Sequence, residues 1–191
     1  MDDAQLIRQF RNGDPESFNR LANRWKDRIH RFAYRYFADR DEAAEITQKT
    51  LINAYQKIDL LRDEGRFSPW IYRIATNLCI DETRKNGRKK TTPIDSLADS
   101  EEAAEHGTPA TRLEQRELGE LLQKALLLIP EEQRAVIILK EYEGLKFREI
   151  ADALDQPLNT VKSRMYYGLQ ALRKVFQHWN IEMEALYDNE K

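Results

Sequence analysis

The chain has 191 residues, of which 41% are hydrophobic and 34% are charged. This length suits one domain or two small ones, and the hydrophobic fraction is sufficient for packed cores. The formal net charge is only −2, whereas a domain that binds DNA unaided is usually strongly basic. The single cysteine, Cys79, excludes an internal disulfide, and its apolar neighbourhood predicts a small buried hydrophobe.

The composition also predicts the fold class. Seven glycines and six prolines, against long runs of Leu, Ala, Glu, Gln, Arg and Lys, predict an all-α protein. The longest apolar run, Ala125 to Ile129, is far below the roughly 20 residues of a membrane helix. The first residues lack a signal-peptide core, so we expect a soluble, cytoplasmic protein without membrane insertion. The three histidines are scattered, so we expect neither a metal nor a cofactor.

In residues 1 to 90, apolar side chains recur at helical spacing. The sequence Asn12-Gly13-Asp14-Pro15 predicts a tight turn between two helices, with Asp14 as cap and Pro15 at the first position of the second helix. The acidic run that begins at Asp39 predicts the start of a third helix, and Ser68-Pro69 that of a fourth. These residues form the first predicted helical domain.

Two polar surfaces follow from this pattern. One side of the third helix is polar and is either solvated or a docking face. On the fourth helix, polar and aromatic residues are expected to face outward or to flank the buried stripe, and they lead into a basic cluster from Arg84 to Lys90. Aromatic residues beside a basic groove can stack on unpaired bases; alternatively, Trp70 and Tyr72 only brace the helix.

Residues 91 to 111 are predicted to be an acidic, flexible linker, because they mix Thr, Pro, Ser, Ala, Gly and acids without periodicity. A second helical domain is predicted over residues 112 to 177, with a tail over residues 178 to 191. Its end is typical of a helix-turn-helix: a helix from Phe147 to Leu154, a break at Asp155-Gln156-Pro157, and a second helix capped by Asn159 or Thr160.

On that second helix a buried stripe is predicted from the spacing of its apolar residues, which are Val161, Met165, Leu169, Leu172 and Phe176. Phosphate- and base-binding side chains occupy the other side. The first turns of such a helix enter the major groove in known helix-turn-helix proteins. A pair of packed helices with a solvated outer face would give the same pattern.

Two blocks resemble one family in the same order along the chain. The first, DEAAEITQKTLINAYQKI followed by FSPWIYRIATNLCIDETRK, resembles region 2 of bacterial sigma factors of the extracytoplasmic-function (ECF) group. The second, IPEEQRAVIILKEYEGLKFREIADAL followed by NTVKSRMYYGLQALRK, resembles their region 4. The resemblance implies a non-enzymatic promoter-specificity subunit of RNA polymerase, used in transcription initiation. It covers nearly the whole chain.

The resemblance also implies roles for particular residues. Docking on the clamp helices of the largest catalytic subunit of RNA polymerase core is implied for Glu45, Gln48, Lys49 and Asn53. Recognition and melting of the minus-10 element is implied for Arg62, Arg66, Phe67, Trp70, Tyr72, Arg73, Thr76, Asn77, Arg84 and Lys85. Recognition of the minus-35 element is implied for Lys162, Ser163, Arg164, Tyr166 and Tyr167. Region 4 is further expected to contact the polymerase flap, and an anti-sigma factor is an expected partner.

Some positions depart from the family pattern. Lys49 stands where an acid is frequent, Asn159 where a glycine is common, and Tyr167 where a basic residue is frequent. The alternative function is a stand-alone helix-turn-helix regulator, which leaves the first block unexplained. An enzyme is disfavoured, because no phosphate loop, catalytic carboxylate pair or activated nucleophile can be assembled from these spacings.

Overall fold

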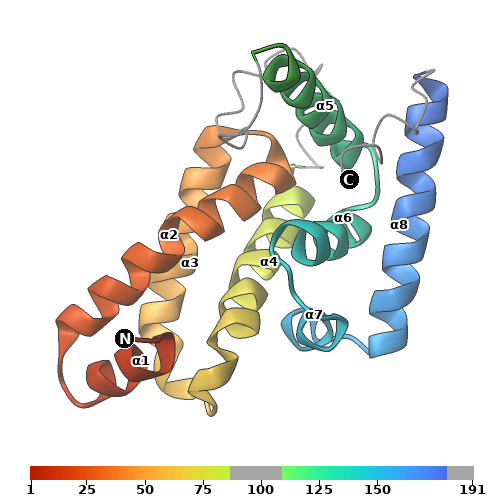
Figure 1. The fold of residues 1–191 in the computed structure, drawn as a ribbon. Coiled ribbons are helices and arrows are strands. Elements are labelled where there is room, and N and C mark those ends of the chain that lie inside the picture. Colours follow the sequence, from red (N-terminus) through yellow and green to blue (C-terminus); the bar gives the residue numbers. More distant parts are fainter. Residues whose placement is uncertain (87–108, 180–191) are drawn as a thin grey trace.

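The computed structural model describes residues 1–86 and 109–179, and within these ranges every regular element is helical (Figure 1). A first unit consists of α1 (Asp3–Arg11), α2 (Pro15–Phe37), α3 (Arg40–Lys57) and α4 (Phe67–Asn86), with 3-10 turns at Ile58–Leu60 and Glu64–Arg66 between α3 and α4. A second unit consists of α5 (Pro109–Leu127), α6 (Glu131–Ile137), a π-helical turn (Ile138–Tyr142), α7 (Phe147–Leu154) and α8 (Leu158–His178). The all-α prediction with two helical units is confirmed.

Most of the predicted linker and tail lie outside the described residues. Residues 109 to 111, at the end of the predicted linker, already belong to α5, and His178, at the start of the predicted tail, ends α8. Trp179 follows and packs edge-on against Phe176, with ring centroids 6.0 Å apart.

The starts of α2 and α3 follow the predicted chemistry. The start of α4 does not: it begins at Phe67, so Ser68 and Pro69 lie inside its first turn and Ser68 is not its cap. Asp14 caps α2 by accepting from the backbone N–H of Glu16, and Pro15 occupies the first helical position. Asp39 caps α3, because its carboxylate accepts from the N–H groups of Asp41 and Glu42 at 2.9 Å each. Such caps satisfy donors that have no partner within the helix.

The core of the first unit is aromatic. Trp25 of α2 meets Phe67 and Tyr72 of α4 edge-on, at centroid distances of 5.4 and 5.7 Å, and Phe32 packs against Tyr72 at 5.5 Å. Tyr72 and Thr76 were predicted to face outward or to flank the buried stripe, but both are fully buried, so an outward orientation is excluded for them. The reason is that α4 is covered on more than one side, by α2 and α3 and also by α6 and α7.

In the second unit, α7 has the predicted bounds, and α8 begins at Leu158, directly after Pro157. Asn159 and Thr160 therefore lie inside its first turn, so the prediction that one of them caps the helix is wrong.

Within the buried stripe of α8, Leu169 is 47% exposed and Gly168 takes its place. A Cβ atom on Gly168 would lie 2.8 Å from Cδ1 of Ile137. The missing side chain therefore lets α8 approach α6 closely.

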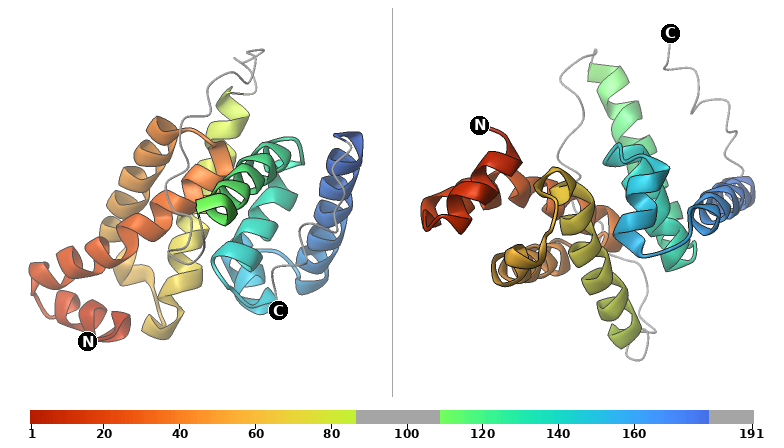
Figure 2. Two further views of the ribbon diagram at one scale, coloured as in Figure 1. Left: turned by 45° about the horizontal axis from the view of Figure 1, so that its top comes forward. Right: turned by 90° about the horizontal axis from the view of Figure 1, so that it is seen from below.

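The two units lie against each other. In Figure 1, α6 and α7 lie between α4 and α8, and the view from below in Figure 2 shows the same order. The buried Arg134 of α6 donates from Nη1 to the carbonyl of Tyr36 at 2.7 Å. Gln123 of α5 donates to the carbonyl of Arg35 at 2.8 Å. Both thereby satisfy carbonyls at the C-terminal end of α2, where no intrahelical donor remains.

Candidate functional site

The first surface with predicted site residues is formed by α4 and the turn before it. Arg62, Arg66, Arg73 and Asn77 are exposed, as are Arg84 and Lys85, whereas Trp70 is half-buried. Phe67, Tyr72 and Thr76 are buried. Desolvation raises the pKa of the buried Tyr72 phenol, and its hydroxyl donates to Glu143 of the second unit.

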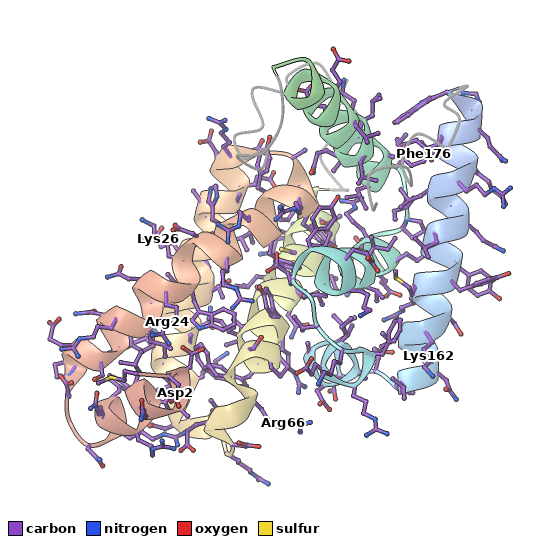
Figure 3. All side chains as sticks on the ribbon, in the orientation of Figure 1. Asp2, Arg24, Lys26, Arg66, Lys162 and Phe176 are labelled. Atoms are coloured by element: carbon purple, nitrogen blue, oxygen red, sulfur yellow. The ribbon has the colours of Figure 1, made fainter. Side chains whose placement is uncertain are left out.

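Several cations of this surface pair with acids of the second unit. Arg66 contacts Asp152 at 2.5 Å and Arg73 contacts Asp155 at 2.8 Å, both through Nη2. Nε of Arg84 lies 3.6 Å from Glu131. Figure 3 shows Arg66 at the foot of α4, on the side that faces α7. Acidic side chains of α6, α7 and the turn after α7 thus occupy positions beside cations that were predicted to bind DNA.

A cavity of about 310 Å³ lies along the same boundary. It is lined by Asn77 and Arg84 of α4, by Glu132 of α6 and by Arg164 of α8, among others. Residues predicted for two different promoter elements therefore line one space in this arrangement. We call the arrangement in which α4 contacts α6 and α7 the closed arrangement.

The second surface is the N-terminal half of α8. Lys162, Ser163, Tyr166 and Tyr167 are exposed, and the two tyrosine rings meet edge-on at 5.5 Å. Figure 3 shows Lys162 at the lower end of α8, on the opposite side of α6 and α7 from α4. Arg164 differs from these four, since its guanidinium is directed to Glu132 of α6 at 2.5 Å and its side chain is 21% exposed.

The third surface is the polar side of α3. Glu45 and Gln48 are exposed, and Lys49 and Asn53 are half-buried. Lys49 lies 2.5 Å from Glu45 and 3.8 Å from Glu82 of α4. Because Lys49 donates a hydrogen bond to it, the pKa of Glu45 is lowered, and the same hydrogen bond raises the pKa of Lys49.

One exposed residue on the polar side of α3 was not among the predicted docking residues. Ile52 is 48% exposed and lies among the four polar residues, three positions after Lys49 and one before Asn53. The signal was present in the sequence, because Ile52 is out of phase with the buried stripe of Ile46, Thr50 and Ala54. A single exposed isoleucine is common on protein surfaces, and this one lies within the predicted docking face.

Comparison with known proteins identifies both halves of the chain. Residues 21–89 match the family description Sigma-70 region 2, and residues 119–172 match Sigma-70, region 4. The ECF RNA polymerase sigma factor SigW of Bacillus subtilis is 36% identical over 180 residues, which cover 88% of this chain and 93% of that protein. The chain belongs to the ECF group of sigma-70 factors. Accordingly α1 to α4 contain region 2, and α5 to α8 contain region 4.

Solved structures share the fold of this sigma factor. The structure of CnrH in complex with the cytosolic domain of CnrY is 21% identical, with a TM-score of 0.67, and covers 92% of this chain and 97% of CnrH. The sigma factor RpoE of Bartonella quintana, in complex with the anti-sigma factor NepR, is 23% identical, with a TM-score of 0.66, and covers 85% of this chain and 98% of RpoE.

The described residues were also compared with the requirements of a membrane helix and of a metal site. Among them, no helix is long and apolar enough to cross a membrane. Within residues 1–86 and 109–179, no group of His, Cys, Asp and Glu side chains is arranged to hold a metal ion. The lone cysteine, Cys79, is fully buried, as predicted, and burial raises the pKa of its thiol well above the usual value.

Proposed function

We infer that this ECF sigma factor binds RNA polymerase core, directs it to specific promoters and promotes strand opening for transcription initiation. The observation that carries this inference is the presence of region 2 and region 4 on one chain, in that order, with SigW similarity over 88% of its length. A stand-alone helix-turn-helix regulator is not favoured, because it gives no reason for region 2. Sigma factors are initiation factors rather than enzymes.

We propose that the exposed residues of α4 and the preceding turn bind the opened minus-10 element. Arg62, Arg66, Arg73, Arg84 and Lys85 supply charge for phosphates, and Asn77 supplies an amide for a base edge. Phe67, Tyr72 and Thr76 form the packed floor beneath them. Extruding a base from the duplex costs a few kcal/mol of unpairing and unstacking free energy. Stacking of that base on the half-buried Trp70 offsets part of this cost.

For the minus-35 element we propose that the first turns of α8 enter the major groove of duplex DNA. Lys162, Ser163, Tyr166 and Tyr167 are exposed there, in the part of the second helix that contacts bases in helix-turn-helix proteins. Arg164 serves this surface indirectly while it pairs with Glu132, because that ion pair ties α8 to α6.

The polar side of α3 is proposed to dock on the clamp helices of the largest polymerase subunit. Glu45, Gln48, Lys49 and Asn53 provide hydrogen bonds and charge, and the exposed Ile52 lies among them. Region 4 is proposed to contact the polymerase flap. The expected function requires this docking, because a protein of net charge −2 has little non-specific affinity for DNA by itself.

We also propose that an anti-sigma factor binds this chain. The RpoE structure of Bartonella quintana contains such a partner, NepR. A pull-down from cells tests the proposal: recovery of a second, non-polymerase protein at equal stoichiometry supports it, and recovery of polymerase alone contradicts it.

The closed arrangement has a consequence for this function. Arg66, Arg73 and Arg84 pair with acids of region 4, so the phosphates of the minus-10 strand have to compete with these carboxylates for the three arginines. We therefore propose that the sigma factor opens between α4 and α7 when it engages polymerase and promoter.

The experiment that tests the proposed function is run-off transcription with purified core and genomic fragments, followed by permanganate footprinting of unpaired thymines. We expect transcription from a subset of fragments that core alone does not use. Asn77→Ala is expected to reduce permanganate reactivity around minus 10 while core binding persists. Wild-type opening by this variant removes Asn77 from the minus-10 surface, and absence of factor-dependent transcription contradicts the function.

A further inference from the structure

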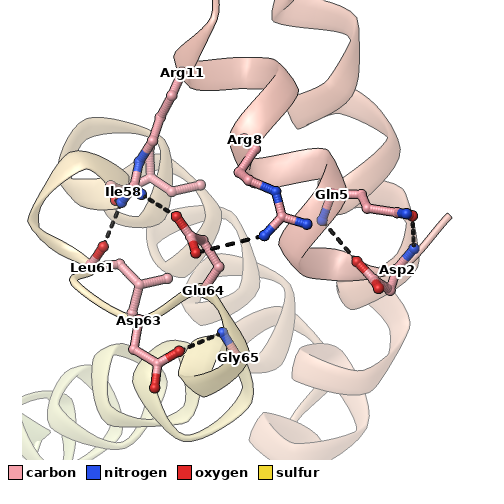
Figure 4. Close-up of polar contacts among 9 residues, drawn as sticks. All are labelled: Asp2, Gln5, Arg8, Arg11, Ile58, Leu61, Asp63, Glu64 and Gly65. Carbon is pink, nitrogen blue, oxygen red and sulfur yellow. Dashed lines mark hydrogen bonds and ion pairs between the residues drawn. The ribbon is translucent and has the colours of Figure 1, made fainter.

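The turn between α3 and α4 is attached to α1, a helix that precedes the segment matched to region 2, which begins at residue 21. Arg11 is the last residue of α1, and its side chain reaches into the turn (Figure 4). Its Nη2 donates to the carbonyls of Ile58 at 2.8 Å and Leu61 at 2.5 Å. Its Nη1 donates to Oε1 of Glu64 at 2.7 Å. One guanidinium therefore joins the end of α3 to the turn that contains Glu64.

The geometry suits arginine in particular. The carbonyls of Ile58 and Leu61 lie just beyond the C-terminal end of α3, where a cation is favoured, and the Ile58 carbonyl also accepts from the backbone N–H of Leu61. A planar guanidinium directs several N–H groups in fixed directions, whereas a lysine ammonium is a point charge on a flexible stem. The side chains of Arg11 and Glu64 are only 24% and 26% exposed, so water competes less for this pair than for a surface ion pair.

The other end of α1 is fixed independently. Asp2 and Gln5 form a reciprocal capping box at 2.7 and 2.9 Å, also drawn in Figure 4, and Leu6 and Ile7 are buried. Asp3 binds Arg24 of α2 at 2.5 Å and the indole N–H of Trp25 at 2.9 Å. Because α1 is anchored on α2 in this way, Arg11 extends from a rigid support.

The attached turn carries residues assigned above to the minus-10 strand. Arg62 and Arg66 lie on either side of Glu64, and Asp63 organises the turn by accepting from the N–H of Gly65 at 2.9 Å. We propose that Arg11 is a positioning residue, which holds the Leu61 to Arg66 turn in the conformation that selects bases of the unpaired minus-10 strand. This proposal rests on the proposed function, because it needs that turn to contact promoter DNA.

Arg11→Ala and Arg11→Lys test the proposal in the full-length protein bound to core. The probes are fork-junction DNAs with an unpaired minus-10 strand in which each base is varied in turn. We expect both variants to lose roughly tenfold in discrimination between preferred and substituted bases, the effect of one charge-assisted hydrogen-bond network. Affinity for core is expected to stay at the wild-type value, and lysine is expected not to rescue.

Arg24→Ala is the matched control, because it removes an arginine that also ties α1 to its surroundings but does not touch the turn. We expect it to keep wild-type base discrimination. If Arg11→Ala and Arg24→Ala lower thermal stability, core affinity and DNA affinity in parallel without changing discrimination, Arg11 only supports the fold and the proposal is overturned.

Hydrogen exchange separates failure of the proposal from failure of the proposed function. In Arg11→Ala we expect faster exchange of the amides of Leu61 and Arg66, which bond within the turn, with α2 unchanged. Unchanged exchange of these two amides overturns the proposal that Arg11 holds the turn, whatever the promoter result. A wild-type protein that shows no base preference on the fork probes contradicts the minus-10 assignment itself, and the role of Arg11 falls with it.

Discussion

At the scale of single residues, one lysine and one arginine near the start of α8 have different surroundings. Lys162 is exposed in the first turns of the helix, whereas Arg164 is directed to Glu132 and lies beside the buried stripe. A phosphate contact from an exposed lysine contributes mainly through counterion release. An arginine that ties α8 to α6 contributes to the orientation of α8 instead.

Lys162→Ala is therefore expected to weaken binding of the holoenzyme to a minus-35 duplex and to reduce the slope of log affinity against log salt by roughly 1. Arg164→Ala is expected to leave that slope unchanged and to lower the stability of region 4 by about 1 kcal/mol. Salt titrations of DNA binding and urea unfolding measure both quantities. The reverse pattern, with the salt slope lost on Arg164→Ala alone, would place Arg164 rather than Lys162 on the DNA.

At the scale of elements, α3 carries the proposed docking face, and its start depends on one side chain. Asp39→Ala removes the cap that accepts from Asp41 and Glu42, so we expect a loss of about 1 kcal/mol in the free energy of unfolding. Core affinity per folded molecule is expected to be unchanged. Asp41→Ala, in the first turn of the same helix, is the control and is expected to cost less; an equal loss would contradict the capping role.

Element positions could largely be predicted from local sequence signals. The turn at Asn12 to Pro15 and the bounds of α7 followed from capping residues, proline and periodicity. The orientation of Tyr72 and Thr76 could not, because a second layer of helices covers α4 and periodicity reports only one buried stripe. Gly168 was missed because a glycine has no hydrophobic side chain to signal burial, although close helix packing requires it.

The exposed residues of the candidate surfaces could be predicted from local sequence signals, but their long-range contacts could not. Exposed positions such as Lys162 and Asn77 follow from helical phase. The contacts of Arg11 with Ile58, Leu61 and Glu64 join residues about fifty positions apart, and no local pattern indicates them. The ion pairs of Arg66 and Arg73 depend on how the two regions pack, which sequence periodicity does not describe.

At the scale of the whole molecule, the closed arrangement combines two kinds of contact. The half-buried Gln123 and the buried Arg134 donate to the C-terminal end of α2, whereas the pairs of Arg66 and Arg73 are largely exposed. Exposed ion pairs contribute only about 0 to 1 kcal/mol each and weaken with salt. The pairs of Arg66 and Arg73 are therefore weak contacts of the boundary, whereas the buried Tyr72 of α4 donates a hydrogen bond to Glu143 of region 4 on the same side.

Asp152→Asn combined with Asp155→Asn tests this distinction, since asparagine keeps the side-chain size and tolerates the left-handed backbone at residue 155, where φ is 52°. We expect the double variant to shift toward an open state by up to about tenfold. Energy transfer between dyes on α4 and α7 measures the shift in the free protein. Glu141→Gln, an exposed acid of region 4, is the control. An unchanged transfer efficiency in the double variant would show that these pairs do not contribute to closure.

The central claim is that this chain is a polymerase specificity subunit, and co-elution with RNA polymerase core tests it most directly. Gel filtration of the purified protein with core is run alone and in competition with a housekeeping sigma factor. The account predicts stoichiometric co-elution that the competitor displaces. Failure to bind core, together with salt-sensitive binding of the free protein to duplex DNA, would contradict it and would favour the stand-alone regulator.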